Sequence, residues 1–322
     1  MQRVLIIGGR GFIGWHLCRL LRAGEFEVVI GARGATADAE FPVLPIDLER
    51  EDLEALRGKL QGFEHVVFAG GKDERVELRG DAYAFFHREN VVPCVKLVQA
   101  ASQAQVQKVL ILGSYFTYFN RQNPGWRMAE RHPYVRSRQA QLEESRAAAS
   151  GQTQVAVLEI PYVFGRAPGM VPIWKPLVEY VRASPLLLYP EGGTAMISVE
   201  DVARAAMGAL LRARHGDCLP LGGHNHTWRE MLEMMASALG KNRRVVSLPY
   251  ASLYPVGALV QSVFDLTGRK SGLNLRHYMQ VQCAQTYLPP STAEYLGYTP
   301  AHIRPAVQQT IEACGSGTRL ES

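Results

Sequence analysis

The sequence predicts an α/β protein built on a doubly wound parallel sheet, and three features of its first half support this. Short apolar runs rich in β-branched residues alternate with segments of helical length and pattern. A glycine-rich turn joins the first run to the first helix, and small or polar residues follow several predicted strand ends, where such sheets bind ligands. We expect this domain over residues 1–165, with a late strand and helix near 196–213 returning to it. Residues 166–322 are expected to form mainly a smaller substrate-binding lobe.

The turn after the first strand carries the strongest functional signal. Residues 4–7 are typical of a buried strand, and an amphipathic helix is expected from 12 to 21. The residues at this junction are Gly8, Gly9, Arg10, Gly11, Phe12, Ile13 and Gly14. The first glycine allows a tight turn, the third lets a pyrophosphate approach the backbone, and the last lets the helix pack closely on the strand. The unpaired N–H groups of the helix start favour an anion. We therefore predict a Rossmann-type dinucleotide site rather than an ordinary glycine turn.

The end of the second strand, expected over 27–30, bears on the choice of dinucleotide. Arg33 stands where an acidic residue would hold the ribose 2′-hydroxyl of NAD. A guanidinium suits a 2′-phosphate through paired charged hydrogen bonds, and Arg10 in the glycine turn could join it. We therefore predict NADP as the cofactor, with NAD as the alternative if both arginines are ordinary surface residues.

Asp47 and Leu48 follow a third strand expected over 43–46. A carboxylate at a strand end beside the adenine can accept a hydrogen bond from the adenine amino group. The same residue could instead be the N-cap of a helix over 50–60. We favour the ligand role because the other strand ends also carry candidate ligands.

The next two strands are expected over 65–68 and 109–112. Ala69 and Gly70 follow the first of them and leave space for a cofactor, and Ser114 follows the second. All of these residues would meet at the carboxyl edge of the parallel sheet, where ligands bind.

Three further segments complete the predicted domain. A long helix ends near residue 105 and contains Asn90. A loop rich in aromatic residues and arginine is expected over 116–132, and a helix of strong helix formers over 134–149. Pro161 follows a sixth strand at 153–158.

The bulk properties exclude several classes of function. The chain has 322 residues, with 47% hydrophobic and 20% charged residues and a net charge of +5. Its basic residues are scattered, so no nucleic-acid partner is expected. No segment approaches the about 18 apolar residues that a membrane span needs. Five dispersed cysteines suggest reduced thiols and a cytoplasmic protein. His224 and His226 fit a polar loop better than a metal site, so no metal is expected.

The sequence resembles the extended branch of the short-chain dehydrogenase/reductase superfamily, which comprises NAD(P)-dependent epimerases, dehydratases and reductases. The resemblance covers nearly the whole chain, and the order and spacing of its motifs are more specific than any one of them. The segments that carry it are 8–14, Asp47-Leu48, Ala69-Gly70, Asn90, Ser114, 134–138, 161–165, 198–203 and 295–300.

The resemblance implies an acid/base role for Tyr134, with Ser114 bonding the same substrate oxygen. A lysine is usual in this family four residues after the tyrosine, on the same helix face, and Arg138 takes its place here. Arginine keeps the charge that stabilises a tyrosinate, but it does not readily lose a proton, which implies altered or absent catalysis. Glu159 and Ile160 also depart from the arginine and proline common there. Without the resemblance, Ser114 could simply bond the backbone and Tyr134 could simply pack.

Three functions follow from the resemblance. The first is an NADP-dependent oxidoreductase acting on the ketone or alcohol of a hydrophobic small molecule, since aromatic and apolar residues dominate 115–132 and 250–264. These side chains could equally be core. The second is a nucleotide-sugar epimerase, dehydratase or reductase, whose diphosphate the arginines at 121, 127 and 131 could meet. The third is a non-catalytic dinucleotide-binding sensor or assembly protein. The family resemblance also suggests a homodimer formed through helices 80–105 and 134–149.

Overall fold

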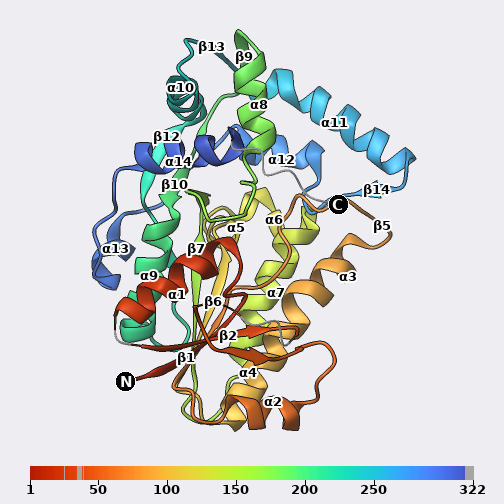
Figure 1. The fold of residues 1–322 in the computed structure, drawn as a ribbon. Coiled ribbons are helices and arrows are strands. Elements are labelled where there is room, and N and C mark those ends of the chain that lie inside the picture. The colour runs from red at the N-terminus through yellow and green to blue at the C-terminus, as the bar shows by residue number, and fades with distance from the viewer. Residues whose placement is uncertain (25, 35–37, 39, 316–322) are drawn as a thin grey trace.

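A seven-stranded, all-parallel sheet forms the centre of the molecule (Figure 1), whose computed structural model describes residues 1–24, 26–34, 38 and 40–315. In spatial order the strands are β11 (Cys218–Pro220), β7 (Gln154–Ile160), β6 (Lys108–Ser114), β4 (His65–Phe68), β1 (Arg3–Ile7), β2 (Glu27–Ala32) and β3 (Val43–Pro45). The chain winds outward from β1 in both directions. This reversal leaves a crevice at the carboxyl ends of the strands, where a ligand binds. The predicted fold class is confirmed.

Helices cover both faces of this sheet. Neighbouring residues of a strand point to opposite faces of the sheet, so the side chains of β1 alternate between the two layers of helices. Val4 and Ile6 belong to the core beneath α1 (Phe12–Ala23) and α9 (Val199–Arg212). Leu5 belongs to the core beneath α2 (Leu53–Leu60), α4 (Val92–Gln103) and α7 (Pro133–Ala148). Burial on both faces explains why these strands are continuously apolar.

The long helix expected up to residue 105 has three parts. It begins as α3 (Ala82–Phe86), continues as a π-helical turn η1 (His87–Val91), and ends as α4. A two-residue strand, β5 (Leu78–Arg79), precedes it and pairs with β14 (Arg269–Lys270). Single π turns in α-helices often mark functional positions, and this one contains Asn90.

The segment 116–132, expected as a loop, is mostly helical, so that prediction was wrong. It forms α5 (Phe116–Gln122), the 3₁₀ turn η2 (Pro124–Trp126) and α6 (Met128–Arg131). Phe116, Phe119 and Met128 are buried in one apolar cluster with Tyr134. Burial of these side chains stabilises short helices whose local sequence does not favour them strongly.

The second lobe is built on small sheets. One contains β8 (Tyr162–Phe164), β10 (Gly193–Ser198), β12 (His224–Thr227) and β15 (Gln285–Thr286), and another pairs β9 (Leu186–Pro190) with β13 (Arg244–Leu248). Its helices are α8 (Lys175–Ala183), α10 (Trp228–Ala238), α11 (Tyr250–Leu266), α12 (Leu275–Gln282), α13 (Ser291–Leu296) and α14 (Ile303–Gly315).

The late strand and helix near 196–213 divide between the two parts of the molecule. Helix α9 packs against the central sheet, whereas β10 pairs with β8 in the small sheet. The seventh strand of the central sheet is instead β11, which pairs with β7. Among the described residues, no helix has the length and hydropathy needed to cross a bilayer.

Candidate functional site

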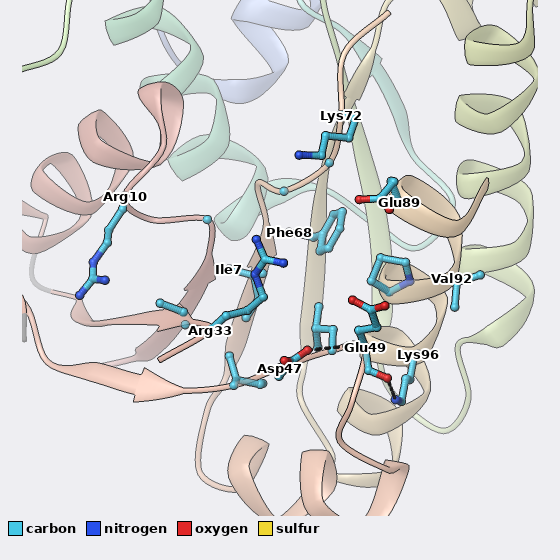
Figure 2. A pocket seen from close by; sticks show the side chains of 18 of the residues that line it. Ile7, Arg10, Arg33, Asp47, Glu49, Phe68, Lys72, Glu89, Val92 and Lys96 are labelled. Atoms are coloured by element: carbon cyan, nitrogen blue, oxygen red, sulfur yellow. Dashed lines mark hydrogen bonds between the residues drawn. The ribbon is translucent and has the colours of Figure 1, made fainter. Parts of the chain in front are cut away.

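A pocket of about 430 Å³ opens at the carboxyl ends of β1, β2, β3 and β4 (Figure 2). Its wall combines the glycine turn, the ends of these strands and the first turn of α4. Six of the predicted cofactor-binding residues line it: Gly8, Arg10, Arg33, Asp47, Leu48 and Gly70. Segments far apart in sequence therefore converge on one pocket at this edge of the sheet.

The glycine turn leaves no room for side chains. Gly8 has a φ of +84°, and a Cβ there would lie 2.8 Å from the carbonyl oxygen of Ala69. A Cβ on Gly14 would lie 2.2 Å from the carbonyl oxygen of Gly8. Gly11 is the N-cap of α1, and no side chain caps that helix start, so its first N–H groups face the turn. This cradle fits the pyrophosphate of a dinucleotide.

The remaining residues of the turn and of the β4 end pack inward. Phe12, Ile13 and Ala69 contact the core beneath α1 and α9. A Cβ on Gly9 would lie 2.9 Å from the side chain of Ile30, so this glycine lets the turn lie against β2. These four residues shape the turn.

The side chains of Arg33 and Arg10, the two predicted arginines at the pocket, point in different directions. Figure 2 shows Arg33 reaching across the pocket toward Phe68, whereas Arg10 points away from it. The Nε of Arg10 lies 3.8 Å from Oδ2 of Asp38, an acidic residue beyond the end of β2 that sequence reasoning did not single out. Arg33 is therefore the better placed of the two for a phosphate on the adenosine ribose.

Asp47 organises the turn after β3. Its Oδ1 accepts hydrogen bonds from the backbone N–H groups of Glu49 at 3.0 Å and Arg50 at 3.3 Å. It is not the N-cap of the following helix, because α2 begins at Leu53 and is capped by Asp52. Of the two roles weighed for Asp47, the helix cap is wrong.

Asn90 is fully buried and clamps the chain after β4. Its Oδ1 accepts from the Lys72 N–H at 2.7 Å, and its Nδ2 donates to the Lys72 carbonyl at 3.1 Å. The backbone carbonyl of Asn90 accepts a hydrogen bond from Nε2 of Gln141 at 2.7 Å. Asn90 therefore holds the segment that follows Gly70.

Tyr134, Ser114 and Arg138 meet at the end of β6. The Nε of Arg138 donates to the Tyr134 hydroxyl at 3.1 Å, and the Ser114 hydroxyl accepts from the Phe116 N–H at 3.4 Å. Burial raises the pKa of Tyr134 above its usual value, and Glu74 raises it further, while Arg138 and Ser114 lower it in part. With the pKa raised on balance, the phenol is protonated at neutral pH.

Arg138 is held by more than Tyr134. The Nη1 of its guanidinium donates to Oε1 of Gln141 at 2.8 Å, one helical turn further along α7. Gln141 then bonds the carbonyl of Asn90, so a continuous set of hydrogen bonds links the phenol to the π turn. The guanidinium is therefore fixed in orientation. No sequence signal pointed to Gln141.

A partly buried carboxyl group belongs to the segment that packs near Tyr134. Burial raises the pKa of Glu74, whose Oε1 lies 3.8 Å from Nε of Arg75, and its charge contributes to raising the pKa of Tyr134, Tyr162 and Tyr278. The hydroxyls of Tyr162 and Tyr278 lie 3.1 Å apart. Sequence reasoning treated the segment around Glu74 as an ordinary charged loop.

The backbone of Gly272 joins this segment to Tyr134. Its N–H donates to the Glu74 carbonyl at 3.1 Å, and its carbonyl accepts from the Tyr134 N–H at 2.9 Å. A Cβ at Gly272 would lie 2.8 Å from both the Glu74 oxygen and the Tyr134 Cβ, so only glycine fits. The second lobe thus contacts the start of α7 directly.

The segment after β7 has a structural explanation for its unusual residues. Pro161 is buried next to Ile160, which is level with Ser114 on the neighbouring strand. Glu159 is fully buried, and Arg121 donates to it at 2.8 Å. Glu159 therefore anchors α5 to the sheet.

The other arginines proposed for a diphosphate do not converge. Arg127 forms an ion pair with Glu130 on the surface, and Arg131 donates to Gln280 at 3.4 Å. The apolar stretch 250–264 lies on α11, whose large side chains are mostly exposed.

Histidines gather elsewhere without forming a metal centre. The ring of His224 stacks against the rings of His226 and His302 on the second lobe. Within the described part of the chain, no three His, Cys, Asp or Glu side chains are placed to share a metal ion.

Known proteins resemble this chain in sequence and in fold. A ceramide reductase from Caulobacter vibrioides (strain NA1000 / CB15N) is 26% identical over 284 residues, covering 84% of this chain and 81% of that protein. The crystal structure of gox2253 superposes with a TM-score of 0.77 at 19% identity, covering 97% of this chain and 98% of that one. A UDP-glucose-4-epimerase from Stenotrophomonas maltophila, with bound NAD and formylated UDP-arabinopyranose, gives 0.68 at 19% identity and 98% coverage of both chains.

The model of one family matches most of the dinucleotide-binding part. It is described as the NAD dependent epimerase/dehydratase family, and it spans residues 4–221. This range includes the glycine turn, the pocket and the Tyr134 site. The chain therefore belongs to the NAD dependent epimerase/dehydratase family, within the extended short-chain dehydrogenase/reductases.

Proposed function

We propose that the protein is an NADP-dependent oxidoreductase that reduces the ketone of a largely hydrophobic, lipid-like molecule. The observation that carries the proposal is the buried Tyr134 hydroxyl, which accepts a hydrogen bond from Arg138 at the carboxyl edge of the sheet, where Ser114 ends β6. Family membership supports nicotinamide-dependent chemistry. The similarity to a ceramide reductase supports both the direction of reaction and the lipid class of the substrate.

The cofactor is assigned to the pocket of Figure 2 by the chemistry of its wall. The start of α1 would bind the pyrophosphate, and Asp47 would accept from the adenine amino group. Arg33 would pair with a 2′-phosphate, which favours NADP over NAD. When bound, this cofactor supplies the hydride that adds to the carbonyl carbon.

The residues of the chain handle the proton. Tyr134 donates its phenolic proton to the carbonyl oxygen as the C–O double bond becomes single, and Ser114 hydrogen-bonds the same oxygen. Arg138 stabilises the resulting tyrosinate by its charge and its Nε hydrogen bond. The protonated phenol is the form that can donate to the carbonyl oxygen in the reduction. Arg138 cannot readily relay a proton, so the tyrosinate recovers its proton from water.

Two other functions compete with this one. A nucleotide-sugar epimerase, dehydratase or reductase is less well supported, because Arg121 is already bound to a buried carboxylate and Arg127 to a surface glutamate. A non-catalytic dinucleotide-binding protein is less well supported because Arg138 makes the contacts that a tyrosinate needs.

The test is NADPH oxidation, followed at 340 nm, with three groups of substrates. These are long-chain ketones carrying an N-acylated amino-alcohol headgroup of the ceramide type, plain long-chain ketones, and sugar nucleotides. We expect turnover with the long-chain ketones and none with sugar nucleotides. Turnover of sugar nucleotides alone would establish the second function. Saturable NADPH binding without turnover of any substrate would establish the third.

A further inference from the structure

Helix α11 presents an apolar face to solvent. Five large apolar residues recur on it every three or four positions and are exposed: Val256, Leu259, Val260, Val263 and Leu266. At about 100° per residue they fall within an arc of about 120° on the helix. Leu259 and Leu266 are 66% and 88% exposed. Figure 1 shows α11 on the outside of the second lobe, with α12 on its inner side. We refer to these five residues as the outer face of α11.

The opposite side of α11 is fixed against the protein, so the outward direction of the apolar face is built into the packing. Gly257 and Gln261 are its two buried residues. A Cβ on Gly257 would lie 2.7 Å from the Leu275 carbonyl oxygen, and Oε1 of Gln261 accepts from the Leu275 N–H at 2.9 Å. An ordinary surface helix buries its apolar side and exposes its polar side. Here a glycine and a polar amide face inward, which indicates that the outer face has a partner.

The charges around α11 indicate what that partner is. Between residues 241 and 282 the basic residues are Lys241, Arg243, Arg244, Arg269, Lys270 and Arg276, and the only acidic residue is Asp265. Lys270 pairs with Asp265 at 2.7 Å, and Arg269 pairs with Glu77. Lys241 and Arg244, before and at the start of the strand that leads into α11, are exposed and form no ion pair with any residue the structure describes, whereas Arg243 donates to the carbonyls of Val181 and Arg182. Two exposed cations on the segment that leads into an exposed apolar helix match the headgroups of an anionic bilayer.

We propose that the outer face of α11 docks on the surface of an anionic lipid membrane, with the helix lying in the plane of the interface. The helix has 17 residues and does not span the bilayer. A second copy of the chain fits less well, because a two-fold contact through this face would bring the same cations together. Helix α12 lies between α11 and the site and carries Tyr278. If the proposed function is correct, docking brings the site close to a membrane-borne substrate.

The test is flotation of the full-length protein with vesicles of phosphatidylcholine containing 30% phosphatidylglycerol, and with vesicles of phosphatidylcholine alone. We expect the protein to float with the anionic vesicles, and 0.5 M NaCl to reduce the bound fraction. The double variant Leu259→Glu/Val263→Glu should lower binding at least tenfold. Leu211→Glu is the matched control, because Leu211 is 55% exposed on α9 and away from this face. Lys241→Glu/Arg244→Glu should lower binding to anionic vesicles only.

Three results would overturn the proposal. They are a wild-type protein that stays in the aqueous phase with both lipids, an α11 double variant that floats as well as the wild type, and a wild-type dimer that the double variant converts to a monomer. NADPH oxidation with a short, water-soluble ketone separates this proposal from the proposed function. The α11 double variant should retain that activity, and loss of vesicle binding alone would leave the catalytic assignment intact.

Discussion

Strand β1 and helix α11 are both strongly apolar, yet they meet opposite surroundings. Val4, Leu5 and Ile6 of β1 are completely buried between two layers of helices. In α11 the large apolar side chains face solvent, and a glycine and a glutamine face the protein. Apolar composition therefore identifies a surface that avoids water, but the topology of the chain decides whether the protein itself covers that surface. The following experiments compare these two regions.

The largest expected effect concerns two tyrosines, one at the site and one on α11. Tyr134→Phe removes the proposed proton donor and should lower kcat by about 10²–10⁴-fold, the usual contribution of general acid catalysis. Tyr254→Phe alters a side chain that is 42% exposed on α11 and should leave kcat unchanged. Steady-state NADPH oxidation with a hydrophobic ketone measures both. Equal activity of Tyr134→Phe and the wild type would remove Tyr134 from the mechanism.

The same substitution in the two regions should change stability differently. Leu5→Ala deletes a side chain that is fully buried in β1, and we expect a loss of about 2–5 kcal/mol in the free energy of unfolding. Leu259→Ala on α11 should change it by less than about 0.5 kcal/mol, as is usual for exposed positions. Urea denaturation without lipid provides the measurement. A comparable loss at Leu259 would mean that the chain covers α11 in solution.

The preference for NADPH over NADH tests whether Arg33, at the carboxyl edge of the sheet, contacts the 2′-phosphate. Arg33→Asp replaces a guanidinium in the pocket by a charge that repels a 2′-phosphate, so the preference for NADPH over NADH should fall about 10–100-fold. The matched control is Arg304→Asp, which makes the same change of charge at an exposed position on α14 that does not line this pocket. Titration of the two reduced cofactors, followed by fluorescence, gives the affinities. An unchanged preference in Arg33→Asp would show that this residue does not contact the phosphate.

The smallest effect concerns a buried histidine that links the lobes. His132 accepts a hydrogen bond from the Asn274 N–H through Nδ1, and burial lowers its pKa to about 3. Because the unfolded chain binds this proton more readily, His132 contributes stability above pH 6.5 that is lost as the pH falls toward 3. The slope approaches about 1.4 kcal/mol per pH unit. His132→Asn keeps an acceptor and removes the titration, so its unfolding free energy should depend less on pH between 6.5 and 4. A slope equal to that of the wild type would contradict this origin.

The features of this protein that could be predicted from its sequence are those set by the pattern of residues within a short segment. The glycine turn, the central strands and the family could be predicted, because each depends on a short stretch whose order fixes its place in the sheet. Leu5 and its neighbours are an example, since strand alternation alone assigns them to the two cores. Arg33, Asp47 and Ser114 lie at strand ends, and the topology gathers such ends at one edge.

The remainder depends on contacts between distant segments. Glu74 and Gln141 are ordinary in sequence, and they come near Tyr134 only when a loop and a helix turn pack together. The helices within 116–132 are stabilised by burial against the second lobe. The outward face of α11 is opposite to the usual assumption that apolar stretches lie inside. Glu74, Gln141 and the helices within 116–132 have no periodic or motif signal of their own, and the periodicity of α11 does not say which of its sides faces the protein.

The backbone of Gly272 has a mechanical consequence. Its N–H donates to the Glu74 carbonyl and its own carbonyl accepts from the Tyr134 N–H, so the main chain of one glycine couples these two segments. A molecule that displaces residues 271–273 would therefore shift the backbone at Glu74 and at Tyr134 together. Selectivity for a molecule bound at the second lobe can then be expressed in turnover as well as in affinity.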